Sequence, residues 1–436
     1  MTDQPTQPPQ PNSPSPLGAL TRRHFLAGTA LTGAAAFLAA CSTSGTSSAP
    51  ASSAAPGTSV APGTSSGPAS SGPQTATGPL KFANWDAYID LTTVPGADGE
   101  VGTDDDEYDL PSPTLDEFAA EYGVVIDYAN AQIEDNESFM ATIRPQLDAG
   151  VATGWDIIVL TDWMAAKVIE AGWAEAIDPA TTATAAANIR DELKGLPWDP
   201  DMTYHYPWQS GATGIGYNRV STGRDLTKVA DLFDPAFAGK VTLLTESRDT
   251  FPLVHLALQA QGKASDNAAE AMTVADAQVV HDYLKTFVEN DHIRAFTGNE
   301  YLQDFGSGDT WAAVVWSGDL ASSAGPDDVF VYPDEGSMIW TDNMLIPKGA
   351  ANKYTAELMI DWVYDVTRAA RLANFIYYIS PVKGVDEAIA ELDPEAGSNP
   401  LLFPPEDVVA KQHPQPTFSE ADEMAINELF ADLTGV

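Results

Sequence analysis

The sequence predicts an α/β protein whose folded part has two lobes and one cleft between them. Segments of strand character alternate with amphipathic helices from Leu80 onward, which is the pattern of a sheet covered by helices. A second block of this kind begins near Gly211. The folded part, about residues 79–436, is also longer than single hydrophobic cores usually become, which favours two lobes.

The residues before this folded part indicate export. Arg22 and Arg23 precede a short stretch rich in Ala, Gly and Thr that ends on Ala39-Ala40-Cys41. This stretch is too short to span a bilayer and is typical of a twin-arginine signal peptide, residues 1–40. The cleavage pattern resembles the bacterial lipoprotein signal, in which the cysteine receives a lipid, so we expect Cys41 to anchor the protein to the outer face of the cytoplasmic membrane. A plain secretory peptide with a chance cysteine is the alternative.

Residues 41–78 continue this N-terminal region as the lipidated cysteine followed by a Ser/Ala/Pro/Gly-rich tether. Residues 42–78 contain no charged side chain and too few large apolar ones to fold. As a flexible coil the tether spans roughly 30 Å, enough to separate a folded domain from a membrane. Cys41 is the only cysteine, so the chain forms no internal disulfide.

The charge balance is strongly acidic. The chain has 62 acidic and 21 basic residues, a formal net charge of −41. Such a chain repels nucleic acid and anionic lipid head groups and attracts cations. A solvated acidic surface that keeps an exported protein soluble explains most of this charge better than a cationic ligand does.

The first lobe reads as alternating strands and helices. Residues 114–122 predict a helix with Thr114 as N-cap and Gly123 as its stop, because Leu115 and Phe118 recur at helical spacing. The other expected elements are strands at 80–85, 124–128 and 155–160, a helix at 137–149, and a helix ending near Gly172. This order predicts a mainly parallel sheet whose ligand site lies beyond the carboxyl ends of the strands.

The second block contains expected strands at 241–244, 312–316 and 329–332. Between the first strand and the first helix, residues 96–113 carry seven carboxylates. Their spacing lacks the alternating ligands and turn glycine of a helix-loop-helix calcium site, so we expect a surface insertion and no metal site.

Aromatic residues recur beside carboxylates at the expected strand ends. The five places are Trp85-Asp86-Ala87-Tyr88, Thr161-Asp162-Trp163, Glu246-Ser247-Arg248-Asp249, Trp316-Ser317-Gly318-Asp319 and Trp340-Thr341-Asp342. Aromatic faces attract ammonium groups and pack against methylenes, while carboxylates accept charge-assisted hydrogen bonds. One such place alone is better explained as a core aromatic near a turn. Five together indicate a site for a cationic, aliphatic ligand.

Six stretches resemble the spermidine/putrescine-binding proteins of ABC importers. They occur in the same order through residues 79–390 and read FANWDAY (82–88), DIIVLTDW (156–163), YPWQSGATGIGYN (206–218), LLTESRDTF (243–251), VVWSG (314–318) and GSMIWTDNMLIP (336–347). The resemblance implies an α/β, two-lobed type II periplasmic-binding-protein fold. The lobes would be residues 79–210 with 339–386 and residues 211–335 with 389–436, joined by crossings near 210–213, 335–339 and 386–389.

The resemblance also implies a polyamine site. Aromatic walls would hold the methylene chain, and acidic residues would hold the amino groups. The walls would be Trp85, Tyr88, Trp163, Trp316, Trp340 and Tyr378; the polar partners would be Glu246, Asp249, Asp342 and the hydroxyl of Thr161. A permease of an ABC transporter would be the protein partner, and a monomer the default state.

The sequence departs from the family pattern in two places. The family usually carries an acidic residue where Ala87 stands, whereas here the carboxylate comes one position earlier, at Asp86. We expect Asp86 to be a ligand-binding residue. If this segment is strand-like, Asp86 faces outward, one ammonium contact is lost, and the length or identity of the ligand changes. The family's polar contact near the C-terminus has no clear match within residues 412–417.

The residues provide no catalytic constellation. Gly211-Ala212-Thr213-Gly214-Ile215-Gly216 lacks dinucleotide-loop spacing, and there is no nucleophile turn or phosphate loop. The six histidines are scattered without metal-ligand spacing, so no cofactor or metal is expected. The alternatives to a polyamine receptor are a receptor of the same fold for another small cationic solute, a secreted hydrolase, and a structural lipoprotein with a vestigial cleft.

Overall fold

The computed structural model describes residues 74–95, 107–109, 112–128, 132–323, 325, 327–394 and 396–435. The signal peptide, Cys41, most of the tether and most of the acidic 96–113 segment lie outside these residues. The described part begins against the folded body, because Thr77 N donates to Thr355 Oγ1 at 2.8 Å. In this part of the chain, none of the helices combines the length and apolar character needed to cross a bilayer.

One sheet runs through the whole molecule. Its strands are ordered β4-β1-β5-β11-β6-β9-β7-β8, with β10 beside β6 and β12 beside β11. The strand bounds are β1 Leu80–Ala83, β2 Thr92–Val94, β3 Glu107–Asp109, β4 Ile126–Tyr128, β5 Ile157–Thr161, β6 His205–Asn218, β7 Val241–Leu244, β8 Ile293–Thr297, β9 Ala312–Trp316, β10 Asp328–Val331, β11 Ser337–Leu345 and β12 Gln412–Pro414. Strands β2 and β3 form a separate, antiparallel two-stranded sheet.

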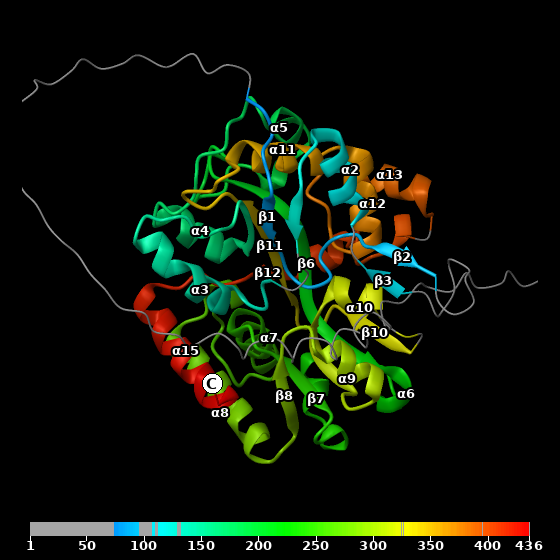
Figure 1. Ribbon diagram of the computed structural model, residues 1–436. Coiled ribbons are helices and arrows are strands. Elements are labelled where there is room, and N and C mark those ends of the chain that lie inside the picture. Colours follow the sequence, from blue (N-terminus) through cyan, green and yellow to red (C-terminus); the bar gives the residue numbers. More distant parts are fainter. Residues whose placement is uncertain are drawn as a thin grey trace, which may run out of the picture.

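Helices pack around each half of this sheet, and Figure 1 shows β6 and β11 passing between the two groups of elements. We call the half built on β4, β1 and β5 the first lobe and the half built on β9, β7 and β8 the second lobe. The helices are α2 Pro113–Tyr122, α3 Asn136–Asp148, α4 Asp162–Glu170, α5 Ala183–Asn188, α6 Arg219–Thr222, α7 Ser247–Ala260, α8 Val274–Glu289, α9 Tyr301–Ser307, α10 Ser317–Ser323, α11 Lys353–Val363, α12 Val366–Ile376, α13 Val385–Leu392, α14 Glu406–Val409 and α15 Glu420–Thr434.

Strand direction confirms the parallel sheet predicted for the first lobe and shows that long antiparallel strands are added to it. Within each lobe the short strands are parallel, as β1 is to β4 and β5, and β7 is to β8 and β9. The two longest strands, β6 and β11, run antiparallel to each other and to β5 and β9. They connect the lobes because the first part of β6 pairs with β11 and its last part pairs with β9 and β10.

Several predicted elements are confirmed, and one cap was wrong. The strands at 241–244 and 312–316 have the predicted bounds, and the helix at 137–149 is displaced by one residue. The N-cap of α2 is Ser112, whose hydroxyl accepts from Leu115 N. Thr114 instead donates its hydroxyl to the buried Asp90 carboxylate at 2.9 Å, because it lies inside the first turn and points into the core. Gly123 ends the helix in the left-handed conformation, as predicted.

Candidate functional site

A cavity lies at the junction of the two lobes. It comprises about 430 Å³ of space between atoms, part of which is open to solvent. Its lining comes from the carboxyl ends of β1, β5, β7 and β9, together with the middle of β11 and segments after α12 and β12. The lining residues are Trp85, Asp86, Tyr88, Asn136, Thr161, Glu246, Asp249, Asn299, Trp316, Asp319, Trp340, Asp342, Tyr378 and Gln415.

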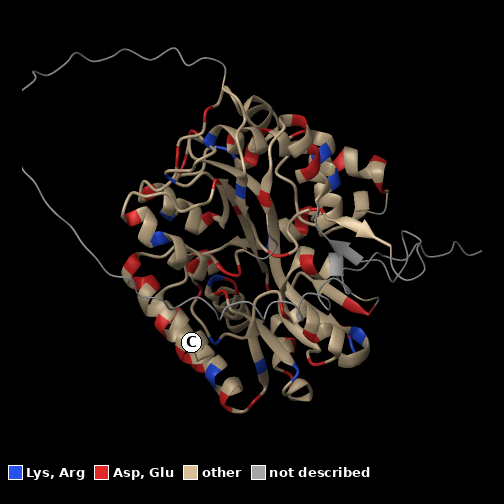
Figure 2. Ribbon diagram, viewed as in Figure 1, with Lys and Arg blue, Asp and Glu red and all other residues tan. Residues whose placement is uncertain are grey.

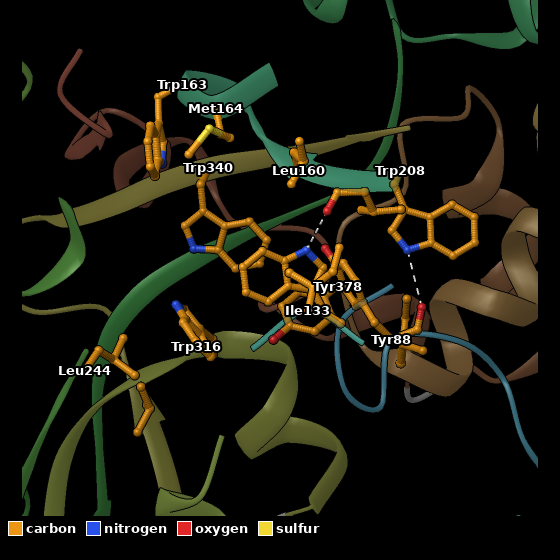
Figure 3. Packing of buried hydrophobic residues seen from close by; sticks show 14 of the residues in the cluster. Tyr88, Ile133, Leu160, Trp163, Met164, Trp208, Leu244, Trp316, Trp340 and Tyr378 are labelled. Atoms are coloured by element: carbon orange, nitrogen blue, oxygen red, sulfur yellow. Dashed lines mark hydrogen bonds between the residues drawn. The ribbon is translucent and has the colours of Figure 1, made fainter. Parts of the chain in front are cut away.

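Aromatic rings form the walls of this cavity. The ring centroids of Trp340 and Tyr378 lie 5.5 Å apart, and those of Tyr88 and Tyr378 lie 5.0 Å apart in an edge-to-face arrangement. Trp85 and Trp316 make a second edge-to-face pair at 6.4 Å, with one ring from each lobe. Figure 3 shows Tyr88, Tyr378, Trp340 and Trp316 gathered around one space. Such rings offer both π-faces for cations and apolar surface for methylenes.

Hydrogen bonds fix the orientation of the indoles. Trp316 Nε1 donates to Asp249 Oδ2 at 3.0 Å, and Trp340 Nε1 donates to Thr213 Oγ1 at 3.1 Å. Thr213 Oγ1 in turn donates to Asp249 Oδ1 at 2.7 Å. One carboxylate from the first turn of α7 therefore holds two walls, from β9 and β11, in fixed orientations.

Two glycines make room for the rings of Trp340 and Tyr378. A Cβ atom on Gly211 in β6 would lie 2.6 Å from the Trp340 ring, and one on Gly318 in α10 would lie 2.4 Å from the Tyr378 ring. Both distances are shorter than nonbonded carbon atoms tolerate. The Gly211–Gly216 segment, which did not fit a dinucleotide loop, thus lies in a strand that supports the cavity.

The charge of the cavity is entirely acidic. Four of its five carboxylates are almost fully buried, with exposed fractions of 7% for Glu246, 1% for Asp249, 3% for Asp319 and 4% for Asp342. No lysine, arginine or histidine is present among the described residues that line it. Buried carboxylates of this number without a cation among them favour a positively charged ligand.

Burial and mutual repulsion make these acids hard to ionise. Burial raises the pKa of Glu246 to about 8, with Asp249 as the next cause. Burial likewise raises the pKa of Asp342 to about 7, although the Thr161 hydroxyl opposes this shift by donating to Asp342 Oδ1 at 2.8 Å. The pKa of Asp249 is also raised by burial.

Asn136, at the start of α3, connects acids of the two lobes. Its side-chain amide donates to Thr161 Oγ1 at 2.9 Å and to Glu246 Oε1 at 3.4 Å, and Thr161 N donates to its Oδ1 at 3.1 Å. Because Thr161 also contacts Asp342, a continuous polar path joins Glu246 of the second lobe to the strands of the first.

A wider groove adjoins the cavity and shares Asp86 and Asn299 with it. It carries additional carboxylates from Glu134, Asp135, Glu137 and Glu300, and the described residues that line it include no basic side chain. Figure 2 shows that acidic residues also predominate over the rest of the ribbon. The approach to the cavity is therefore as acidic as its interior.

Ten of the eleven predicted site residues line this one cavity. They are Trp85, Asp86, Tyr88, Thr161, Glu246, Asp249, Trp316, Trp340, Asp342 and Tyr378. Trp163 does not line it: in Figure 3 its ring lies apart from the others, and the guanidinium carbon of Arg248 lies 3.6 Å from its centroid. Trp163 belongs to the first turn of α4, which directs this side chain away from the cavity.

Four lining residues were missed. Asp319 lies in the Trp316-Ser317-Gly318-Asp319 motif, so the aromatic–carboxylate pattern contained a signal for it. Its carboxylate accepts from Tyr378 at 2.7 Å and from Tyr301 at 2.9 Å. Gln415 lies within the C-terminal stretch that had no clear match. Asn136 and Asn299 are isolated amides, and no sequence pattern distinguishes them.

The expectation that Asp86 faces outward assumed strand-like geometry, and the structure differs there. Ala87 has a φ of 50°, so the chain turns after Trp85 and strand alternation does not apply. Asp86 lines the cavity.

A two-lobed α/β fold with an acidic, aromatic cavity at the lobe junction is typical of an extracytoplasmic solute receptor. The chain belongs to the bacterial extracellular solute-binding protein family, whose sequence pattern matches residues 114–404. The predicted export and the prediction of a receptor rather than an enzyme are thereby confirmed.

Individual relatives are likewise periplasmic binding proteins. The spermidine/putrescine-binding periplasmic protein 1 of Haemophilus influenzae is 27% identical over 315 residues, which cover 72% of this chain and 82% of that protein. The spermidine/putrescine-binding periplasmic protein of Escherichia coli is 25% identical over 298 residues, 68% of this chain and 80% of that protein. The resemblance noted in the sequence is thus confirmed.

A solved structure shows the fold. The spermidine/putrescine ABC transporter substrate-binding protein of Streptococcus pneumoniae superposes with a TM-score of 0.62 at 20% identity. The match covers 82% of this chain and 98% of that protein. The predicted two-lobed periplasmic-binding fold is confirmed by this likeness.

Proposed function

We propose that this protein captures polyamines of the putrescine/spermidine type outside the cytoplasm and delivers them to the permease of an ABC transporter. The observation that carries this proposal is a cavity lined by five carboxylates and five aromatic side chains without a basic residue among its described lining. A diamine matches this lining because its ammonium groups pair with carboxylates while its methylenes pack on rings. The names of the relatives from Haemophilus influenzae and Escherichia coli support the same ligand class.

Within this proposal the ten lining residues named from the sequence contact the ligand, together with Asp319. Trp85, Tyr88, Trp316, Trp340 and Tyr378 hold the methylene chain. Asp342 and Thr161 lie on the strands that reach the first lobe, whereas Glu246, Asp249 and Asp319 come from the second lobe. Acids on both sides of the cavity suit a ligand with a positive charge at each end.

We also propose that the lobes, residues 79–210 with 339–386 and residues 211–335 with 389–436, close on the ligand by bending β6 and β11. β11 pairs with β5 of the first lobe, β6 pairs with β9 of the second lobe, and the two strands pair with each other. Hinge closure around a ligand needs only a few residues that absorb the backbone change.

The test is calorimetric titration of the folded domain, residues 74–436, with putrescine, cadaverine, spermidine and spermine. Arginine and glutamate serve as a cationic amino acid and an anionic control. We expect at least one polyamine to bind with a dissociation constant in the micromolar range or below, which corresponds to about −8 kcal/mol or stronger. Binding of arginine with no polyamine bound would point to another cationic solute, and binding of glutamate alone would refute the proposal.

The membrane anchor is a separate part of the proposal. We propose that lipid on Cys41 holds the receptor near its permease and that the tether gives it reach. Substitution Cys41→Ser is expected to move the exported protein from the membrane fraction to the soluble fraction, because a lipid chain supplies the membrane affinity. Fractionation with detection of the folded domain measures this, and unchanged membrane association of the variant contradicts it.

A further inference from the structure

We infer that Arg248 is a positioning residue for ligand capture, which holds four cavity-lining segments from both lobes in place without lining the cavity itself. This inference rests on the proposed function. Arg248 lies in the first turn of α7, between Glu246 and Asp249, and its exposed fraction is 1%.

The Arg248 guanidinium lies between side chains of the two lobes. Its carbon lies 3.6 Å from the ring centroid of Trp163 on α4 of the first lobe, and 5.0 Å from that of Phe418. Nη2 donates to Glu423 Oε1 on α15 at 2.6 Å, and Nε donates to the Pro416 carbonyl at 3.2 Å.

Polar contacts near Arg248 also join α15 to α3 and α4. Arg248 Nη1 lies 3.6 Å from Glu137 Oε1 on α3, and Asn427 Nδ2 of α15 donates to the same Glu137 oxygen at 2.9 Å. Lys167 of α4 forms an ion pair with Glu423. Burial opposes the ionisation of Glu423, but Lys167 and Arg248 together keep its pKa below the ordinary value.

Three of the groups that Arg248 contacts are close in sequence to a residue of the cavity. Glu137 follows Asn136, Trp163 comes two residues after Thr161, and Pro416 follows Gln415. Gln415 itself donates to Asp249 Oδ1 at 2.7 Å. Through these short connections one side chain fixes the relative position of α3, α4, α7 and the segment before α15.

This arrangement also accounts for the buried positive charge. An arginine packed on tryptophan and paired with carboxylates keeps its charge when buried. Parting of the lobes would separate Arg248 from Trp163 and Glu137 and expose it to water. The contact is therefore complete only when the two lobes are together, as the cavity is.

A purely electrostatic role and a positioning role of Arg248 predict opposite changes in ligand affinity for Arg248→Met. Removal of a positive charge near the acidic cavity would by itself strengthen the binding of a cation. If Arg248 positions the site, putrescine or spermidine binds at least about tenfold more weakly, through faster dissociation. Rapid-mixing fluorescence gives the two rate constants, and calorimetry gives the dissociation constant. Arg248→Lys keeps the charge without the planar stack and is expected to restore part of the affinity.

Arg368→Met is the matched control, because Arg368 stacks on Trp362 at 3.3 Å within one lobe. It is expected to leave affinity within about twofold. Trp163→Leu is a second variant, which leaves the net charge unchanged and removes the ring on which Arg248 packs. It tests the role of Arg248 if Arg248→Met does not fold. Weaker binding by Trp163→Leu with normal binding by Arg368→Met supports the inference. Wild-type affinity for Trp163→Leu and Arg248→Met overturns it.

A ligand-independent measurement separates this inference from the proposed function. Amide hydrogen exchange of the ligand-free protein is expected to be faster around residues 134–140 and 161–166 in Arg248→Met or Trp163→Leu, and unchanged there in Arg368→Met. A wild-type protein that binds no polyamine refutes the proposed ligand, while the exchange pattern still decides the role of Arg248. Unchanged exchange in both variants overturns the inference.

Discussion

Burial of Asp342 in the cavity opposes the ionisation of its carboxyl group. Asp342 lies in the middle of β11, its exposed fraction is 4%, and it accepts a hydrogen bond from the Thr161 hydroxyl at 2.8 Å. Burial, with repulsion from Asp162 and Asp249 as a smaller cause, raises its pKa and makes its ionisation unfavourable in the absence of a ligand cation. A ligand ammonium would remove that penalty, so the charge of this residue is expected to contribute to binding.

We predict that Asp342→Asn weakens polyamine binding by more than about tenfold, because the ammonium loses its counter-charge while the shape of the side chain is kept. The Thr161 hydroxyl retains an oxygen acceptor in this variant, so the local fold is preserved. Calorimetry with putrescine measures the effect. Glu406→Gln, which removes an exposed carboxylate from α14, is the control and is expected to leave the dissociation constant unchanged. Equal affinities of the two variants would remove Asp342 from the site.

Single residues also show which parts of the site can be predicted from the sequence. Aromatic–carboxylate motifs at strand ends contained nine of the ten predicted lining residues, because side chains that follow the carboxyl ends of neighbouring strands meet at one edge of a sheet, and the family resemblance implied Tyr378. The same pattern assigned Trp163 to the ligand, although a helix begins at Asp162 and turns its ring toward Arg248. Asn136 and Asn299 had no signal, since an isolated amide does not differ from one in a turn.

At the scale of elements, the junction of β9 and α10 determines how the aromatic rings that line the cavity pack against each other. Trp316 ends β9, Gly318 and Asp319 lie in the first turn of α10, and Asp319 accepts a hydrogen bond from Tyr378 at 2.7 Å. The ring of Tyr378 occupies the space that a side chain at position 318 would need.

We predict that Gly318→Ala weakens polyamine binding by about tenfold or more while the protein remains folded. The added methyl group would lie 2.4 Å from the Tyr378 ring and must displace it from Trp340 and Asp319. Gly298→Ala is the control, because a methyl group there meets nothing closer than Glu300 Oε2 at 3.4 Å. Titration and circular dichroism of both variants measure binding and folding. Full affinity in Gly318→Ala would show that the position of Tyr378 does not matter for binding.

Strand β6 is the element that sequence reasoning did not recognise. Almost all of its fourteen residues are buried, so it lacks the alternation of a half-exposed strand. It also contains Pro207 and three glycines, which usually indicate loops. The structure accommodates Pro207 at a register shift opposite Asn343, and the glycines where the Trp340, Tyr378 and Phe330 rings and Val315 approach closely. These reasons are tertiary and have no local signature.

At the scale of the whole molecule, the acidic cavity couples ligand binding to pH. In the ligand-free protein the pKa of Glu246 is about 8 and that of Asp342 about 7. Below these values the carboxyl groups hold protons, and a bound diammonium ligand favours their ionised forms. Binding must therefore release protons, and affinity rises with pH until the groups are ionised.

We predict net proton release on putrescine binding at pH 7 and an affinity that increases from pH 6 to pH 8. Calorimetry at pH 7 in two buffers of different ionisation enthalpy measures the released protons. Glu246→Gln is expected to release fewer protons, since a carboxyl group with a pKa of about 8 is removed. An observed enthalpy that is independent of the buffer would contradict this coupling.

The sequence by itself determined the class of fold, the export of the chain and most of the residues around the cavity. These follow from local patterns: hydrophobic periodicity, an N-terminal signal, and aromatic–carboxylate pairs at strand ends. The family to which the chain belongs agrees with them. Local patterns suffice there because each feature depends on residues close together in the chain.

Only the tertiary structure decided which side chains share the cavity and which support it. Asp249 orients two indoles from other strands, Gly211 and Gly318 make room for rings far away in sequence, and Arg248 joins four segments of both lobes. The physical reason is that these roles depend on packing and charge between segments far apart in the sequence, where direction and distance are set by the fold.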